Sequence, residues 1–192
     1  MKEWLHRNLN KWRPLLGVSL LRLHYKAARA GGVRHKMSIR AYTQHDLAAI
    51  YDIYNRSKLD ELKFELKVFT LLPLEEDDVR LNGLMESEIY VHQEQDQILG
   101  FGAVCGNEIR ALFVLPECRG QGVGKKLLEF LLSNIQGQPC LYVASTNQPA
   151  KYLYQLYGFS VTDTFETTYN QVAVIAQKMA RIAPVKTSRS VN

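Results

Sequence analysis

The sequence has few of the residues that build disulfide scaffolds, collagen-like repeats and membrane spans. Its 192 residues include 3 cysteines, 6 prolines and 12 glycines, which excludes a disulfide framework and a low-complexity chain. No run reaches the ~18–20 apolar residues of a membrane helix, because the apolar stretch Leu15 to Leu21 ends at Arg22. The cysteines share no C-x-x-C spacing and the five histidines never fall at i, i+3 or i+4. We therefore expect no metal site, and a reducing, cytoplasmic location.

Acidic residues are almost absent from the first 36 positions, which hold nine Lys or Arg residues and one acid, Glu3. The other 156 residues hold 15 basic and 18 acidic residues, so the net charge of +5 is the sum of +8 and −3. The body is therefore mildly acidic and is not expected to bind nucleic acid, which requires basic side chains along a phosphate backbone. Its apolar fraction, 46% for the whole chain, is typical of a globular domain.

The charge boundary divides the chain into a basic extension, residues 1–36, a domain, residues 37–180, and a tail, residues 181–192. Three interpretations of the extension stay open. It could be an amphipathic helix that contacts an anionic membrane or a partner, or an acid-poor targeting peptide. It could also be translated sequence upstream of a true start at Met37.

The hydrophobic pattern of the body predicts strands that alternate with helices. Pro116 and Gly158 mark ends of elements, and Thr43 with Asp46 marks the start of a helix. Strands are expected at 38–42, 88–93, 97–105, 108–115, 140–144, 159–164 and 172–179. Helices are expected at 47–54, 59–66, 75–85, 127–135 and 150–157. The fold class is α+β, a mixed and mostly antiparallel sheet flanked by helices.

A glycine-rich turn, Arg119-Gly120-Gln121-Gly122-Val123-Gly124-Lys125, joins a predicted strand to a predicted helix. Backbone N–H groups at a helix N-terminus bind phosphate. The turn is not a Walker A loop, since Lys126 follows Gly124-Lys125 and Arg119 occupies the position of the first glycine. It also lacks the third glycine of a dinucleotide loop, because Leu127 stands there. A turn without any ligand is the alternative.

A second motif lies about 25 residues further on, Asn147-Gln148-Pro149-Ala150-Lys151-Tyr152-Leu153-Tyr154-Gln155-Leu156-Tyr157-Gly158-Phe159. Together the two motifs resemble those of the GNAT superfamily of N-acetyltransferases. Arg119, Gly122 and Gly124 match its Arg/Gln-x-x-Gly-x-Gly/Ala loop. The second motif matches at Asn147, Ala150, Tyr154, Gly158 and Phe159. The resemblance covers about residues 37–180 and implies a GNAT-like fold.

The resemblance implies that acetyl-CoA is the co-substrate. Its diphosphate would be held by backbone N–H groups of Arg119, Gly120, Gln121, Gly122, Val123, Gly124 and Lys125. Lys125 and Lys126 could add charge, or simply form a solvated face. The pantetheine arm would run along Leu112, Phe113 and Val114, and an N–H of Leu112 or Phe113 would polarise the thioester carbonyl. Asn147 would contact the cofactor or cap the helix.

Two side chains are implied in proton transfer. Tyr154 stands at the family position of the general acid for the CoA thiolate, although core packing would also explain a tyrosine there. Glu108 stands where several family members keep a general base, and an exposed carboxylate at a strand end is the alternative. Glu86, Glu88 and His92 are weaker substitutes. A base matters because an amine of pKa ~10.4 is neutral in only about one molecule in 2,500 at pH 7.

The implied activity is acetyl transfer to a primary amine of a small molecule, peptide or protein, and the sequence does not identify this acceptor. In this fold the acceptor wall would be residues 57–69 and 164–172, where Asp60, Glu61 and Glu65 could attract a cation or form helical ion pairs. A catalytically inactive CoA-binding sensor or partner module is the alternative function. The oligomeric state, monomer or homodimer, stays open. Cys105 and Cys118 have no histidine at motif spacing, so we do not expect a nucleophilic cysteine.

Overall fold

The computed structural model describes residues 37–181. The predicted basic extension, residues 1–36, and residues 182–192 of the predicted tail lie outside the described residues. All three interpretations of the extension, including a membrane or partner contact, therefore concern residues outside the described ones. Among the helices of residues 37–181, none is long and apolar enough to cross a membrane.

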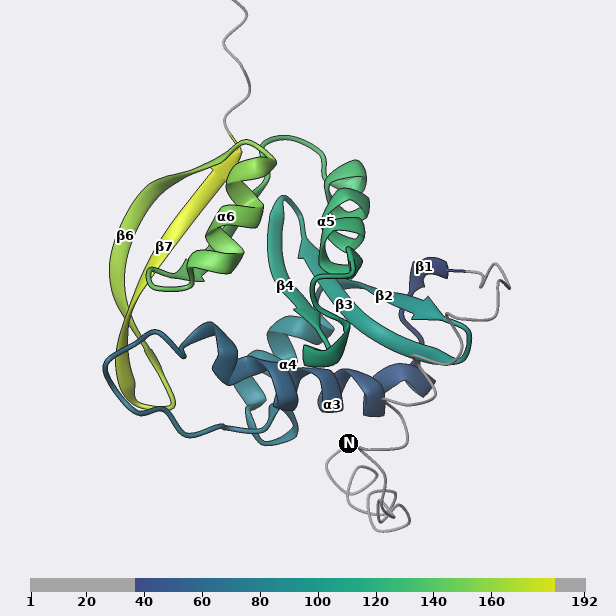
Figure 1. Ribbon diagram of the computed structural model, residues 1–192, viewed down its shortest axis with the longest axis horizontal. Coiled ribbons are helices and arrows are strands. Elements are labelled where there is room, and N and C mark those ends of the chain that lie inside the picture. The colour runs from purple at the N-terminus through teal and green to yellow at the C-terminus, as the bar shows by residue number, and fades with distance from the viewer. Residues whose placement is uncertain (1–36, 182–192) are drawn as a thin grey trace, which may run out of the picture. The chain divides into compact units, whose positions relative to one another are not determined.

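A seven-stranded sheet organises the described residues, with the strand order β1-β2-β3-β4-β5-β7-β6 (Figure 1). The β4–β5 pair is parallel and the other neighbours are antiparallel. The strands are β1 (Met37–Ala41), β2 (Glu88–Glu94), β3 (Gln97–Cys105), β4 (Glu108–Val114), β5 (Cys140–Ala144), β6 (Phe159–Tyr169) and β7 (Val172–Arg181). The predicted fold class, a mixed and mostly antiparallel sheet with flanking helices, is confirmed.

Four helices flank this sheet: α3 (Leu47–Ser57), α4 (Asp78–Met85), α5 (Val123–Asn134) and α6 (Gln148–Leu156). Short 3₁₀ turns also occur: η2 (Gln44–Asp46), η3 (Lys58–Glu61), η4 (Leu74–Glu76) and η5 (Pro116–Cys118). In Figure 1, α3 and α4 lie on one side of strands β2–β4 and α5 lies on the other.

The alternation of β3 and β4 explains this two-sided packing. Phe101 and Phe113 are cross-strand partners that turn toward α3, where the ring of Tyr54 packs 5.3 Å from that of Phe113. Gly100 lies on the opposite face, where a Cβ would lie 3.2 Å from a methyl carbon of Leu127 in α5. The core under α5 and α6 consists of apolar side chains from both helices and from β3 to β7: Val104, Ile109, Leu128, Leu131, Leu141, Val143, Tyr154, Phe159 and Met179.

Strands β4 and β5 stay paired over only two residue pairs, Glu108–Ile109 with Cys140–Leu141. The β3–β4 register shifts between Ala103 and Val104, which leaves Arg110 as the extra residue of a bulge. Beyond this bulge, the edge of β4 that faces β5 is free of ladder hydrogen bonds with β5. This free edge forms one wall of the site described below.

One predicted helix, residues 59–66, is wrong beyond its first turn. The structure has only η3 there, and the chain then runs on without a regular element. Tertiary contacts explain the difference, because Leu62 is buried against β6 and β7 and Glu65 accepts a hydrogen bond from Thr146 at 2.6 Å. Lys67 donates to the carbonyl of Ala173 at 3.0 Å. These tertiary contacts fix the segment in an irregular conformation, in place of the helix that the alternating charges predicted.

We expect Gly100→Ala to lower the free energy of unfolding by ~1–3 kcal/mol, since its Cβ would lie 2.6 Å from the backbone oxygen of Phe113 and would force β4 outward. Gly83→Ala is the matched control. Its Cβ meets only an Arg110 nitrogen at 4.0 Å, inside α4, so we expect a gain of ~0.5–1 kcal/mol. Urea denaturation measures both. Equal effects of the two substitutions would contradict the close approach of β3 and β4.

Candidate functional site

The glycine-rich turn presents the N-terminus of α5 to one end of a large cavity. Gly122 is the N-cap residue, with φ +85° and ψ 0°, in the left-handed region where a Cβ is strained. Its position requires glycine, and no side chain of the described residues caps the helix there. The first N–H groups of this 12-residue helix are thus available to an anion.

The cavity has a volume of about 690 Å³ and extends from this turn, along β4, to α6 and the β6–β7 hairpin. It brings together ten of the thirteen predicted site residues: Leu112, Phe113, Val114, Arg119, Gly120, Gly122, Gly124, Lys125, Asn147 and Tyr154. Both predicted acceptor segments also contribute to its wall, including Ser57–Lys63 in part and Thr167–Tyr169. A single continuous space therefore joins the two sequence motifs.

Three predicted site residues do not line this cavity. Val123 is buried in the core, and the amide of Gln121 donates to the carbonyl of Glu117 at 2.9 Å. Glu108 lines a second, smaller cavity of about 300 Å³. A side-chain role for Gln121 or Val123 in the large cavity has no support, whereas their backbone groups belong to the same turn.

Arg119 links the glycine-rich turn to η3. Its guanidinium forms an ion pair with Asp60, and its Nε donates to the carbonyl of Val114 at 3.3 Å. A second ion pair, Arg56 with Glu117 at 2.8 Å, ties the end of α3 to η5 just before the turn. The turn and the end of α3 are consequently fixed against each other.

Asn147 serves as the N-cap of α6, because its side-chain oxygen accepts a hydrogen bond from the N–H of Ala150 at 3.3 Å. This is one of the two uses that the sequence left open. Asn147 also lines the large cavity. The cap hydrogen bond therefore holds in place a side chain of the cavity wall.

Of the three tyrosines in and after α6, only Tyr154 reaches the cavities. Tyr152 is 65% exposed, and the Tyr157 hydroxyl donates to Glu129 at 2.7 Å. Tyr154 is buried and lines both cavities. Burial, reinforced by the negative charge of Glu61, raises the pKa of Tyr154 well above its ordinary value. Its phenol therefore keeps its proton at neutral pH.

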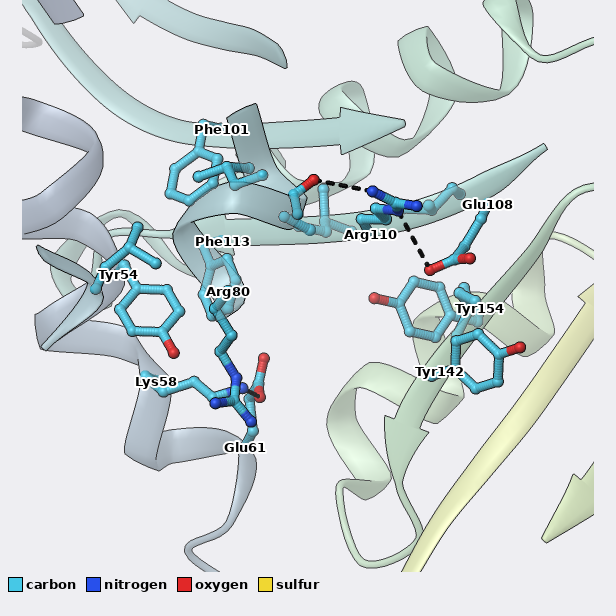
Figure 2. Close-up of a pocket in the computed structure, with 17 residues that line it drawn as sticks. Tyr54, Lys58, Glu61, Arg80, Phe101, Glu108, Arg110, Phe113, Tyr142 and Tyr154 are labelled. Atoms are coloured by element: carbon cyan, nitrogen blue, oxygen red, sulfur yellow. Dashed lines mark hydrogen bonds and ion pairs between the residues drawn. The ribbon is translucent and has the colours of Figure 1, made fainter. Parts of the chain in front are cut away.

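Glu108 begins β4 on the far side of the smaller cavity from η3 (Figure 2). Its carboxylate lies 3.7 Å from Nε of Arg110. Arg110 also lies 3.6 Å from the carboxylate of Glu86 and donates to the carbonyl of Gly83 at 3.0 Å. Glu108 is thus a partly exposed carboxylate held by a shared arginine at the edge of the cavity.

The sequence analysis missed two cations in the wall that the cavities share. Lys58, Glu61 and Arg80 line both cavities, and in Figure 2 they face the Glu108–Arg110 pair across the smaller one. Arg80 is bound to Asp77 at 2.5 Å, and its guanidinium lies 4.8 Å from the ring centre of Tyr169. In this part of the wall the sequence had pointed only to acids that could attract a cation, Asp60, Glu61 and Glu65. Lys58 and Arg80 belong to no motif.

Residues 37–181 contain no group of three or more His, Cys, Asp or Glu side chains that could hold a metal ion. The three cysteines are free thiols. Cys105 and Cys140 lie on either side of β4, two strand spacings apart, which is about 10 Å and too far for a disulfide.

Tyr54 is a buried polar side chain in the wall of the smaller cavity. Its hydroxyl is buried without a hydrogen-bond partner among the described residues. Burial raises the pKa of Tyr54, and the nearby charge of Arg80 opposes that shift. We expect Tyr54→Phe to raise the free energy of unfolding by ~1 kcal/mol, because it removes an unsatisfied buried group. Urea denaturation tests this.

Tyr169→Phe is the matched control, because the Tyr169 hydroxyl accepts a hydrogen bond from the N–H of Leu72 at 3.0 Å. Its loss should lower the free energy of unfolding by about 1 kcal/mol. Destabilisation by both substitutions would show that the Tyr54 hydroxyl is satisfied in solution.

Comparison with known proteins gives matches of family, sequence and fold. Residues 85–161 match the family model of the acetyltransferase (GNAT) domain. The peptidyl-lysine N-acetyltransferase YjaB of Salmonella typhimurium is 38% identical over 73 residues, which are 38% of this chain and 50% of that protein. YjaB of Escherichia coli is 36% identical over 91 residues, 47% of this chain and 61% of that protein. The chain thus spans about half the length of the curated relatives it matches.

Solved structures extend the likeness to nearly the whole of each neighbour. Apo YjaB from Escherichia coli superimposes with a TM-score of 0.59 and 27% identity, covering 78% of this chain and 99% of that chain. The fold of yncA from Salmonella typhimurium, solved with its cofactor acetyl-CoA, gives a TM-score of 0.58 at 20% identity, with 78% and 98% covered. Residues 85–161 therefore match the acetyltransferase (GNAT) domain, and the chain shares the fold of apo YjaB and of yncA.

Proposed function

We propose that the protein transfers an acetyl group from acetyl-CoA to a primary amine by direct attack of the amine on the thioester. The observation that carries this proposal is the single cavity that joins the N-terminus of α5, the free edge of β4 and the phenol of Tyr154. Curated relatives are peptidyl-lysine N-acetyltransferases, so a lysine side chain in a peptide is the first acceptor to test.

The residues present fit acetyl-CoA. The uncapped N-terminus of α5 and the left-handed Gly122 offer N–H groups to a diphosphate without a Cβ in the way. The edge of β4 at Leu112–Val114 is unpaired with β5, and its backbone groups that point away from β3 would bind the amides of the pantetheine arm. The carbonyl of Val114 already accepts hydrogen bonds from Ser57 at 3.1 Å and from Arg119 at 3.3 Å. The thioester of acetyl-CoA supplies the activated acetyl group.

The chain's own groups would then carry the chemistry. A backbone N–H of Leu112 or Phe113 would donate to the thioester oxygen as negative charge develops on it. Tyr154, which holds its proton at neutral pH, would protonate the departing sulfur. Glu108 is our proposed base for the acceptor, acting through water from the smaller cavity. Glu61, in the wall shared by both cavities, is a second carboxylate that could steer or deprotonate a cationic amine.

The domain organisation and the location belong to this proposal too. We take residues 37–180 as the catalytic domain and residues 1–36 as a basic extension. The three free thiols support the expected reducing, cytoplasmic location.

Acetyl-CoA at about a hundred times its dissociation constant should stabilise the protein by ~2.7 kcal/mol, measured as a thermal shift. Gly124→Glu should remove most of this shift, because it places a carboxylate beside the proposed diphosphate site. Gly124→Ala is the control, since its Cβ would make an ordinary 3.5 Å contact with Val114 inside α5. A shift of full size in Gly124→Glu would contradict the loop assignment.

Tyr154→Phe should lower kcat about a hundredfold or more, the range of a lost general acid, while the thermal shift with acetyl-CoA is kept. CoA release with lysine peptides measures the first effect. Tyr152→Phe, at an exposed position of the same helix, should leave both readings unchanged. Binding of acetyl-CoA without any turnover, across peptide and small-amine acceptors, would instead favour an inactive CoA-binding module.

A further inference from the structure

The ammonium group of Lys58 occupies a built site at the junction of the two cavities. Lys58 is the first residue of η3, directly after α3, and its side chain is only 14% exposed. Its Nζ donates to Oε2 of Glu61 at 2.6 Å. Three aromatic ring centres lie around the same nitrogen, those of Tyr54 at 5.8 Å, Phe113 at 5.9 Å and Tyr169 at 5.3 Å.

Rings and a carboxylate of this kind bind a primary ammonium by cation–π attraction and a charge-assisted hydrogen bond. An acceptor lysine entering the cavity would need the same partners. Here a lysine of the chain itself, Lys58, has these partners.

Two other lysines line the large cavity, and neither has this setting. Lys63 lies over the ring of Phe64 at 5.0 Å, and Lys125 is 63% exposed and 3.9 Å from Glu129. Neither lines the smaller cavity. Lys58 is therefore distinguished from the described lysines of this wall by its burial and by a carboxylate within hydrogen-bond reach.

We propose that Lys58 is a self-acetylation site: in the absence of another acceptor, the protein transfers the acetyl group of acetyl-CoA to its own Lys58 within one molecule. This proposal rests on the proposed function. It assigns a modification site to a residue that the proposed transfer to an external amine does not use.

The site contains the groups that this step requires. Glu61 already accepts a hydrogen bond from the ammonium and takes one of its protons, as a base within reach of the proton it removes. The lone pair of Nζ attacks the thioester carbon, so a C–N bond forms and the C–S bond breaks. Tyr154 protonates the thiolate and regains a proton from solvent, to which the new amide loses its extra proton. The products are acetyl-lysine, CoA and one proton.

Lys58 lies beside the segment of β4 along which the pantetheine arm is proposed to run. Phe113 belongs to the segment of β4 proposed to face the thioester, and Nζ already lies over its ring. Lys58 also lines the large cavity, in which the free edge of β4 is exposed. Rotation about the bonds of its four-carbon stem can move Nζ from the rings toward that edge without a change in η3.

The test is mass spectrometry of the full-length protein incubated with acetyl-CoA and no acceptor. We expect one added acetyl group per chain, mapped by proteolysis to Lys58, at a first-order rate that does not depend on protein concentration. Lys58→Arg keeps the cation beside Glu61 and should abolish this product. Lys63→Arg should leave it in place. Glu61→Gln should slow it by about a hundredfold or more.

Several results would overturn the proposal. One is no acetyl group on Lys58 in protein that shows the thermal shift with acetyl-CoA. Others are a rate proportional to protein concentration, or acetylation of Lys58 that is equally fast in heat-denatured protein. CoA release with lysine peptides, measured in parallel, separates the two claims. Turnover of peptides without modification of Lys58 removes only the self-acetylation, whereas the absence of both removes the proposed function as well.

Discussion

The site depends on the early separation of β4 and β5. These parallel neighbours share two residue pairs, and the bulge at Arg110 falls just where their pairing stops. A sheet that stayed paired would satisfy the edge of β4 with the edge of β5 and leave no room for a ligand between them. Because the strands diverge, Leu112, Phe113 and Val114 line the large cavity instead of pairing with β5. Gly100 supports this arrangement from the other side by letting β3 approach β4 closely.

Two ion pairs from one 3₁₀ turn connect the parts of the site. Asp60 of η3 binds Arg119 beside the glycine-rich turn, and Glu61 of the same turn binds Lys58 in the wall shared by the cavities. The four residues Lys58–Glu61 thus contact both the proposed phosphate site and the proposed acceptor site. An anion bound at the glycine-rich turn would attract Arg119 and weaken its ion pair with Asp60. Asp60 belongs to η3, which also carries Lys58. This gives a short physical connection between the proposed phosphate site and the proposed acceptor site.

Much of this protein could be predicted from sequence because its main signals are local. Gly122, Asn147 and Tyr154 each belong to a motif, and the backbone conformations and helix cap that those motifs imply are present. The strand periods and turn residues likewise gave the fold class. The segment after Lys58 could not be predicted in the same way, since Leu62, Glu65 and Lys67 are held by β6, by Thr146 between β5 and α6, and by β7, all far away in the sequence.

The cations of the shared wall were missed for the same reason. The position of Arg80 is set by Asp77 and by the ring of Tyr169, nearly ninety residues further along the chain. The rings around Lys58 come from α3, β4 and β6. No window of sequence contains such a set. The motifs therefore predicted the residues proposed to bind the cofactor, and the resemblance predicted the two acceptor segments, whereas the cations Lys58 and Arg80 became visible only when the chain was folded.

The outermost strand has a consequence for solubility during folding and in the native state. β6 ends the strand order, and its residues between Phe159 and Tyr169 are exposed along its length. A long free edge of this kind is a template on which other chains can add strands and aggregate. In β6 the register shift between Val161 and Asp163 disturbs the edge, and Asp163 and Glu166 place like charges along it. The same hairpin can thus border an open cavity while resisting strand addition by another molecule.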